Sequence, residues 1–162
     1  GRFFGGDLGL QHRFAEVFTH SHQFGLTFAE IEHEGSIQAS RRSAPLQGRH
    51  SLAQKWTQKW WGEVNLNWAA GVAGAGLSPL DAHDLRVCPS VNKPWLSTAQ
   101  AQVVCDGTPA WWTTGVRVVY QRSKDWRTGL RIDNLLDRKY RRHQSAAWAK
   151  GITVRLDVEV AF

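Results

Sequence analysis

The most regular pattern in the sequence is the alternation of apolar and polar residues over its last segment, 151–162. The apolar positions are Ile152, Val154, Leu156, Val158, Val160 and Phe162, and the positions between them are Thr153, Arg155, Asp157, Glu159 and Ala161. Successive side chains of a β-strand point to opposite faces. This period therefore predicts a strand with one apolar face and one charged face.

Six further segments carry the same period less perfectly: 3–14, 22–29, 48–57, 60–70, 111–122 and 126–133. His12 interrupts the apolar side of the first of these segments, and Gln54 interrupts that of the third. No segment has a convincing helical period. The sequence thus predicts an all-β, antiparallel fold of about seven strands.

The predicted connections alternate between short and long. The short ones are 15–21, 58–59 and 123–125, and the long ones are 33–47, 71–110 and 134–150. Four of the five prolines lie in the longest connection. Outer-membrane β-barrels have this arrangement, with short turns on the periplasmic side and long loops outside.

Aromatic residues gather at the ends of the predicted strands. Phe14, Trp56, Trp60, Tyr120, Trp126 and Phe162 fall at one end, and Phe3, Phe4, Trp111 and Trp112 fall at the other. Membrane barrels carry such aromatic girdles at both membrane interfaces. We therefore predict a transmembrane β-barrel whose lumen side carries Arg13, Glu63, Arg117, Arg131, Asp133, Arg155 and Asp157.

Composition narrows the function classes. The chain has 162 residues, a length typical of one domain, and it contains no apolar run long enough for a membrane-spanning helix. Its net charge is +6, but the 20 Lys and Arg are scattered, so we expect no nucleic-acid partner. No enzyme motif is present, and we predict no catalytic residue, cofactor or metal site.

The strand number indicates an incomplete barrel. Single-chain bacterial barrels have an even number of strands, and an open sheet edge is not tolerated in lipid. The sequence contains no Met, and this also favours a piece of a longer protein. Two alternatives stay open: a complete eight-stranded barrel that acts as an adhesin or structural protein, and a soluble β-sandwich or lipocalin-like binding protein.

A family resemblance lies in the last third of the chain. The stretch 129–140 contains Asn134, Leu135, Asp137 and Tyr140, and it is followed by Gly151 and a last strand that ends at Phe162. This order resembles the C-terminal end of TonB-dependent outer-membrane receptors, with Leu136 where that family usually has Phe. Residues 105–162 carry most of the resemblance.

The resemblance implies that residues 1–162 are the C-terminal segment of a barrel of about 22 strands with a plugged lumen, and that the plug is absent from this chain. It implies uptake of a scarce ligand of the ferric siderophore, haem or cobalamin class, powered by TonB through the absent N-terminal region. The implied location is the outer membrane of a Gram-negative bacterium, in contact with lipid. Phe162 is then part of the signal that the barrel-assembly machinery reads.

Several polar residues have specific expectations. We expect Asn134 and Asp137 to fix the loop after their strand rather than to contact ligand. Cys88 and Cys105 lie in the longest connection, where a disulfide of an extracytoplasmic loop is expected. His20 and His22, together with His33, suggest copper or haem capture, but their placement in a short turn favours solvated histidines.

Overall fold

The computed structural model describes residues 2–33, 36–39, 45–72, 107–143, 145 and 147–161. These ranges contain eight strands: β1 Arg2–Phe14, β2 Phe18–His33, β3 Ser36–Ala39, β4 Gln47–Lys55, β5 Trp60–Ala69, β6 Trp111–Ser123, β7 Trp126–Asp133 and β8 Thr153–Val160. No helix in the described part of the chain has the length and hydrophobicity needed to cross a membrane.

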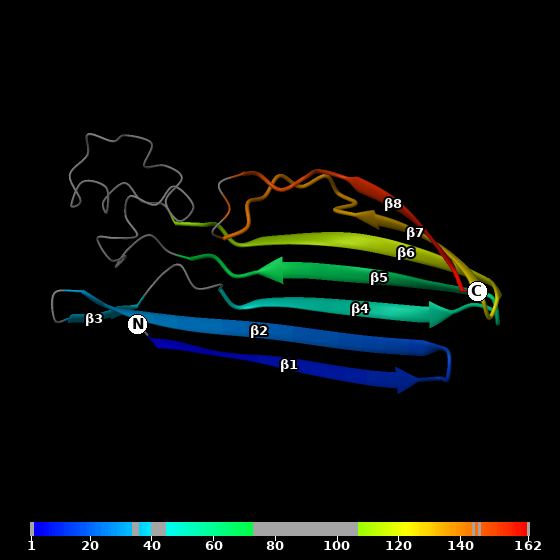
Figure 1. Ribbon diagram of the computed structural model, residues 1–162, viewed down its shortest axis with the longest axis horizontal. Helices are drawn as coiled ribbons and strands as arrows, with labels where there is room; N and C mark the ends of the chain where they lie inside the picture. The colour runs from blue at the N-terminus through cyan, green and yellow to red at the C-terminus, as the bar shows by residue number, and fades with distance from the viewer. Residues whose placement is uncertain are drawn as a thin grey trace.

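The strands form one antiparallel sheet in the order β1-β2-β4-β5-β6-β7-β8 (Figure 1). The short strand β3 lies off this path and pairs with the far end of β2. Strands β1 and β8 form the two edges, and no pairing between them is seen in the described ranges. The sheet is therefore open, and the described residues do not form the closed eight-stranded barrel that was one alternative.

The register places apolar and polar side chains on opposite faces of the sheet. One row of directly opposed residues consists of His12, His20, Leu52, Val64, Val116, Ile132 and Val154. The next row along the strands consists of Arg13, Thr19, Ala53, Glu63, Arg117, Arg131 and Arg155. Because neighbouring residues of a strand point to opposite sides, we call the face of the first row the apolar face and that of the second the polar face. The seven residues predicted to share the lumen side all lie on the polar face.

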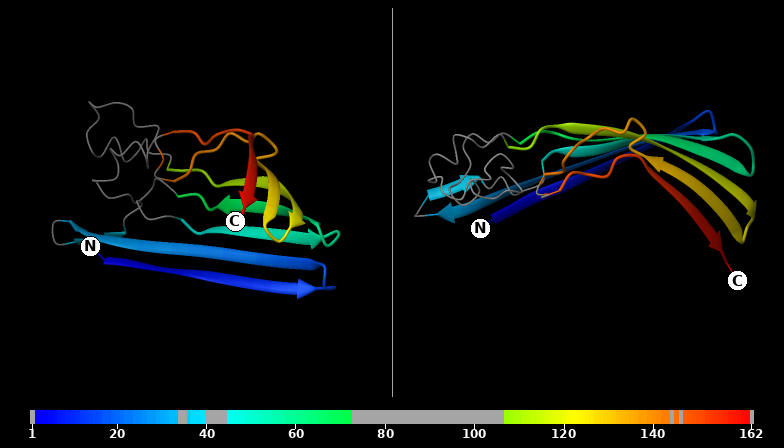
Figure 2. Two further views of the ribbon diagram at one scale, coloured as in Figure 1. Left: turned by 45° about the vertical axis from the view of Figure 1, so that its right-hand side comes forward. Right: turned by 90° about the horizontal axis from the view of Figure 1, so that it is seen from above.

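Many large side chains of the apolar face are exposed. Leu156 is 67% exposed, and Val154, Val64 and Phe28 are exposed to a similar degree. In Figure 2 the sheet bends as one curved layer. A soluble β-sandwich would bury these side chains under a second sheet, and no second sheet lies in the described ranges. The strands that the structure describes therefore do not form a β-sandwich.

The tight connections and most of the predicted aromatic residues meet at one end of the sheet, which we call the turn end. Phe14 opposes Phe18, Trp60 opposes Tyr120, and Trp126 opposes Val160 at this end. Phe3, Phe4, Trp111 and Trp112 lie at the other ends of β1 and β6, as predicted. We call that side the loop end.

Two predicted connections are wrong in their bounds. The turn after β1 comprises only residues 15–17, and β2 begins at Phe18. His20 and His22 therefore lie within a strand and are half-buried, rather than in a solvated turn. The predicted loop 33–47 contains β3, which extends the hairpin with β2.

Candidate functional site

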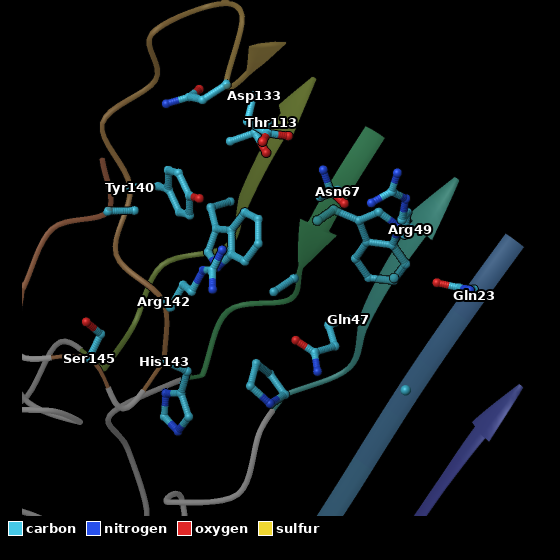
Figure 3. Close-up of a pocket in the computed structure, with 18 of the residues that line it drawn as sticks. Gln23, Gln47, Arg49, Asn67, Thr113, Asp133, Tyr140, Arg142, His143 and Ser145 are labelled. Atoms are coloured by element: carbon cyan, nitrogen blue, oxygen red, sulfur yellow. The ribbon is translucent and has the colours of Figure 1, made fainter. Parts of the chain in front are cut away.

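The polar face contains a hollow of about 1160 Å³. Its floor comes from β1, β2, β4, β5, β6, β7 and β8, and its loop-end wall comes from residues 140–151. Figure 3 shows Tyr140, Arg142, His143 and Ser145 on one side of the hollow and Gln47, Arg49 and Asn67 on the other. The curvature of the sheet thus brings side chains from widely separated strands around one space.

Charged side chains on the hollow's floor form ion pairs. The Arg49 Nη2 atom donates to Glu63 Oε1 at 2.6 Å, between neighbouring strands. The Arg131 Nε atom lies 2.9 Å from the Asp133 carboxylate on the same strand. These half-buried pairs fix the directions of the arginine side chains on the floor.

Basic groups outnumber carboxylates around the hollow. The lining has five Arg or Lys residues, namely Arg49, Arg131, Arg142, Lys150 and Arg155, and two carboxylates, Asp7 and Asp133. Deeper in the same row, the Arg117 guanidinium lies 5.3 Å from the centre of the Trp61 ring, and its Nε atom is buried with no hydrogen-bond partner. The lining of the hollow therefore carries an excess of positive charge and suits a partner with anionic groups.

Residues 134–151 form a segment that we call the covering segment, and Asn134 fixes its start. Asn134 is 5% exposed and has a φ of 53°, a left-handed conformation that asparagine tolerates. Its Nδ2 group donates to the carbonyls of Arg138 and Lys150, at 2.9 and 3.3 Å, and its Oδ1 atom accepts from the Arg138 N–H at 3.0 Å. One side chain thus joins the two ends of the covering segment.

Asp137 fixes the end of the covering segment. Its Oδ1 atom accepts the N–H of Ile152 at 3.1 Å, and its φ is 48°. A Cβ atom at position 151 would collide with the same Oδ1 atom, so any larger residue than Gly151 would displace this carboxylate. These contacts are those expected of a structural role for Asn134 and Asp137.

Aromatic side chains support the covering segment. The Tyr140 ring packs on the Trp111 ring with centroids 4.5 Å apart, and the Tyr140 carbonyl accepts the N–H of Ala149. The Arg138 guanidinium lies 4.1 Å from the Trp112 ring centre. The covering segment is thus anchored on the aromatic residues at the start of β6.

The loop-end part of the covering segment holds polar groups next to the hollow. The Thr108 hydroxyl and His143 Nδ1 lie 3.0 Å apart, and Thr108 pairs with Val72 through its backbone. Arg141 is 5% exposed, and desolvation lowers the pKa of its guanidinium. Trp148, which also lines the hollow, is 69% exposed. An exposed tryptophan beside Arg142 and Lys150 is a ready contact surface for a ligand.

The residues predicted as a site fall into three groups. Asn134, Asp137, Tyr140 and Gly151 lie together in the covering segment, whereas Leu135 has an exposed side chain and bonds to Thr114 through its backbone N–H. Cys88, Cys105 and Phe162 lie outside the described residues, so the disulfide and the terminal signal stay predictions.

The hollow could not be predicted from the sequence. Its lining residues Arg49, Asn67, Arg142 and Trp148 come together only when the sheet curves and the covering segment folds. Only Arg49 and Asn67 had a signal in the sequence, because they alternate with apolar residues on predicted strands. Within the described ranges, no group of three or more His, Cys, Asp or Glu residues is arranged to hold a metal ion.

The fold defines a curved, single-layer segment of a β-barrel wall, and comparisons with solved structures place it. It is similar to part of the copper transporter OprC, with a TM-score of 0.70 and 16% identity, over 99% of this chain and 23% of that protein. It is also similar to part of the siderophore receptor PiuA from Acinetobacter baumannii, with a TM-score of 0.56 and 14% identity, over 98% of this chain and 21% of that one.

This chain therefore spans less than a quarter of the length of the two proteins. Its fold is the one found in a part of each of these two proteins, which are named as a copper transporter and a siderophore receptor. No family model and no curated protein matches the sequence.

Proposed function

We propose that this chain is a wall segment of a TonB-dependent receptor in the outer membrane of a Gram-negative bacterium. The observation that carries the proposal is the bare apolar face of a single curved sheet, opposite a polar face that holds a hollow. Exposed apolar patches of this extent are unfavourable in water and stable against lipid chains. Aromatic residues at both ends of the strands support the same orientation.

In this proposal each part of the segment has a distinct task. The apolar face contacts outer-membrane lipid, and the polar face contacts water or the plug of the whole receptor. The excess of positive charge around the hollow suits acidic groups on that plug or on a ligand, since a cationic surface attracts anionic groups. The barrel-assembly machinery reads the end of the last strand at Phe162, and TonB acts through the part of the receptor that holds the plug.

The cargo is proposed only as a class. The sequence resemblance supports a scarce ligand such as a ferric siderophore, haem or a cobalamin, and copper is a further candidate because one of the similar structures is a copper transporter. The hollow would form part of the ligand mouth, and Trp148 and Arg142 would be among its first contacts.

Uptake by the intact receptor tests this proposal. Cells that lack the gene should take up one of these cargoes more slowly under limitation for it, and inactivation of TonB should cause the same defect. Trp148→Ala and Arg142→Ala should each weaken cargo binding by about 1 to 2 kcal/mol. Lys124→Ala, in the turn after β6 at the opposite end of the sheet, is the matched control and should leave binding unchanged.

Two results would contradict the proposal. One is recovery of the intact protein as a soluble monomer without detergent. The other is cargo uptake that continues at the normal rate when either the gene or TonB is inactivated.

A further inference from the structure

The apolar face carries four histidines, and they gather on β1, β2 and β4. His12 directly opposes His20, and His22 directly opposes His50. The rings of His20 and His22 lie 4.0 Å apart, and those of His22 and His50 lie 4.8 Å apart. Elsewhere this face is largely aliphatic and aromatic, and ionisable groups on such a surface call for a functional explanation.

Two hydrogen bonds connect two of these histidines and Trp68 in a line. The Trp68 Nε1–H group donates to His50 Nε2 at 3.0 Å, and His50 Nδ1 lies 2.6 Å from His22 Nδ1. Indole nitrogen only donates, so His50 Nε2 must be the unprotonated nitrogen of its ring. In a neutral imidazole the other nitrogen then carries the hydrogen, so His50 Nδ1–H donates to His22 Nδ1. His22 in turn carries its hydrogen on Nε2.

We call Trp68, His50 and His22 the imidazole relay, and its surroundings are apolar. The Trp68 ring lies over Gly48, where an added Cβ atom would come within 2.9 Å of the ring. Phe24 packs beside both His22 and His50. The titratable groups that share this face nearby are His20 on β2 and His12 on β1, and the facing part of β5 contributes only Gly62, Val64, Leu66 and Trp68.

We propose that the imidazole relay is an acid-sensitive latch that joins β2, β4 and β5 on the outer surface of the wall. The line of hydrogen bonds exists only while both rings are neutral. A second proton on His22 would set two N–H groups against each other at the His22–His50 contact, and a second proton on His50 would do so at its contact with Trp68, because a charged imidazole only donates. Acid would also place charge on a surface without a carboxylate partner among the groups named above.

Histidine gains its charge as the pH falls from about 8 to about 5. The latch is therefore closed at neutral pH and opens in acid, and this loosens the pairing of β4 with β2 and β5 in that part of the wall. Such opening would operate whichever cargo the barrel carries.

Nitrogen NMR of the intact protein in detergent micelles, with ¹⁵N-labelled histidine, tests the closed state. At pH 8 we expect His50 to be protonated on Nδ1 and His22 on Nε2. An Nε2–H tautomer of His50 would overturn the proposal, since that nitrogen would then be unable to accept from Trp68.

Hydrogen exchange of the same intact protein tests the opening. Between pH 8 and pH 5, the protection factors of amides in β2, β4 and β5 should fall by about tenfold, the effect of losing one half-buried hydrogen bond. His50→Phe should abolish this pH dependence, whereas the control His12→Phe, on the same face but outside the relay, should keep it. Protection in the unmodified protein that does not change with pH, or a fall that persists in His50→Phe, would overturn the proposal.

Discussion

The apolar face has different side-chain chemistry on β8 and on β2 and β4. On β8 the face is purely aliphatic, with Val154, Leu156, Val158 and Val160 in succession, and all four are exposed. On β2 and β4 the same face carries imidazoles that satisfy one another and Trp68. The apolar side chains of β8 are suited to lipid by their composition alone. On β2 and β4, contact with lipid requires hydrogen bonds between side chains to satisfy the polar groups.

The largest expected effect on the free energy of unfolding comes from placing a charge on the apolar face of β8. Leu156→Arg puts a guanidinium on the face that we assign to lipid, near the middle of β8, and it should lower the free energy of unfolding by about 2 to 4 kcal/mol. Arg155→Leu, one residue away on the polar face, should cost less. Urea unfolding of the intact protein from lipid vesicles measures both changes. Equal costs, or a larger cost for Arg155→Leu, would contradict the assignment of the two faces.

A neutral imidazole on the apolar face of β8 should have a smaller effect, and it tests the difference between β8 and the strands that carry the histidines. Leu156→His introduces a ring whose directly opposed residue, Leu130, offers no hydrogen-bond partner, and it should cost about 1 to 3 kcal/mol at pH 8. Leu10→His directly opposes His22 in the register and is the matched control. It should cost clearly less, because a partner is in reach. If the two substitutions cost the same by urea unfolding, then the histidine cluster confers no special tolerance.

The smallest effect is expected on the polar face near the turn end. Arg127 and Glu159 form an ion pair between β7 and β8 and are both exposed. Solvent screens such a pair, so Glu159→Ala should change the free energy of unfolding by less than about 1 kcal/mol, and added salt should reduce the change further. A loss comparable to that of Leu156→Arg would mean that this part of the polar face is shielded from water.

Much of the fold could be predicted from the sequence because side-chain alternation is a local property. The segment 151–162 alternates without a break, and β8 occupies Thr153–Val160 within it. All seven strands of the main path correspond to predicted segments. The grouping of the charged residues on one face followed directly from the same period.

The errors have local physical causes. The turn after β1 is made by Ala15 and Glu16 with φ values of 47° and 52°, although neither residue type favours that conformation. Because no Gly, Asn or Pro marks this turn, the predicted turn is too long. The prediction therefore assigned His20 and His22 to the turn and not to β2. Strand β3 has only four residues, too few to show a period.

The site could be predicted only in part. The contact of Asn134 with Arg138 is local, and the expectation that Asn134 fixes the loop needed nothing more. The contact of Asn134 with Lys150 spans 16 residues, and the hollow requires seven strands to curve together. Such non-local geometry is set by tertiary packing, and the period of the sequence carries no information about it.

The central claim is that one face of the sheet meets lipid and the other meets water or protein. Spin labels placed singly at positions 154–159 of the intact protein in lipid vesicles test this claim most directly. We expect labels at 154, 156 and 158 to be accessible to oxygen dissolved in the lipid, and labels at 155, 157 and 159 to be inaccessible. Absence of this two-residue alternation, or its reversal, would contradict the account.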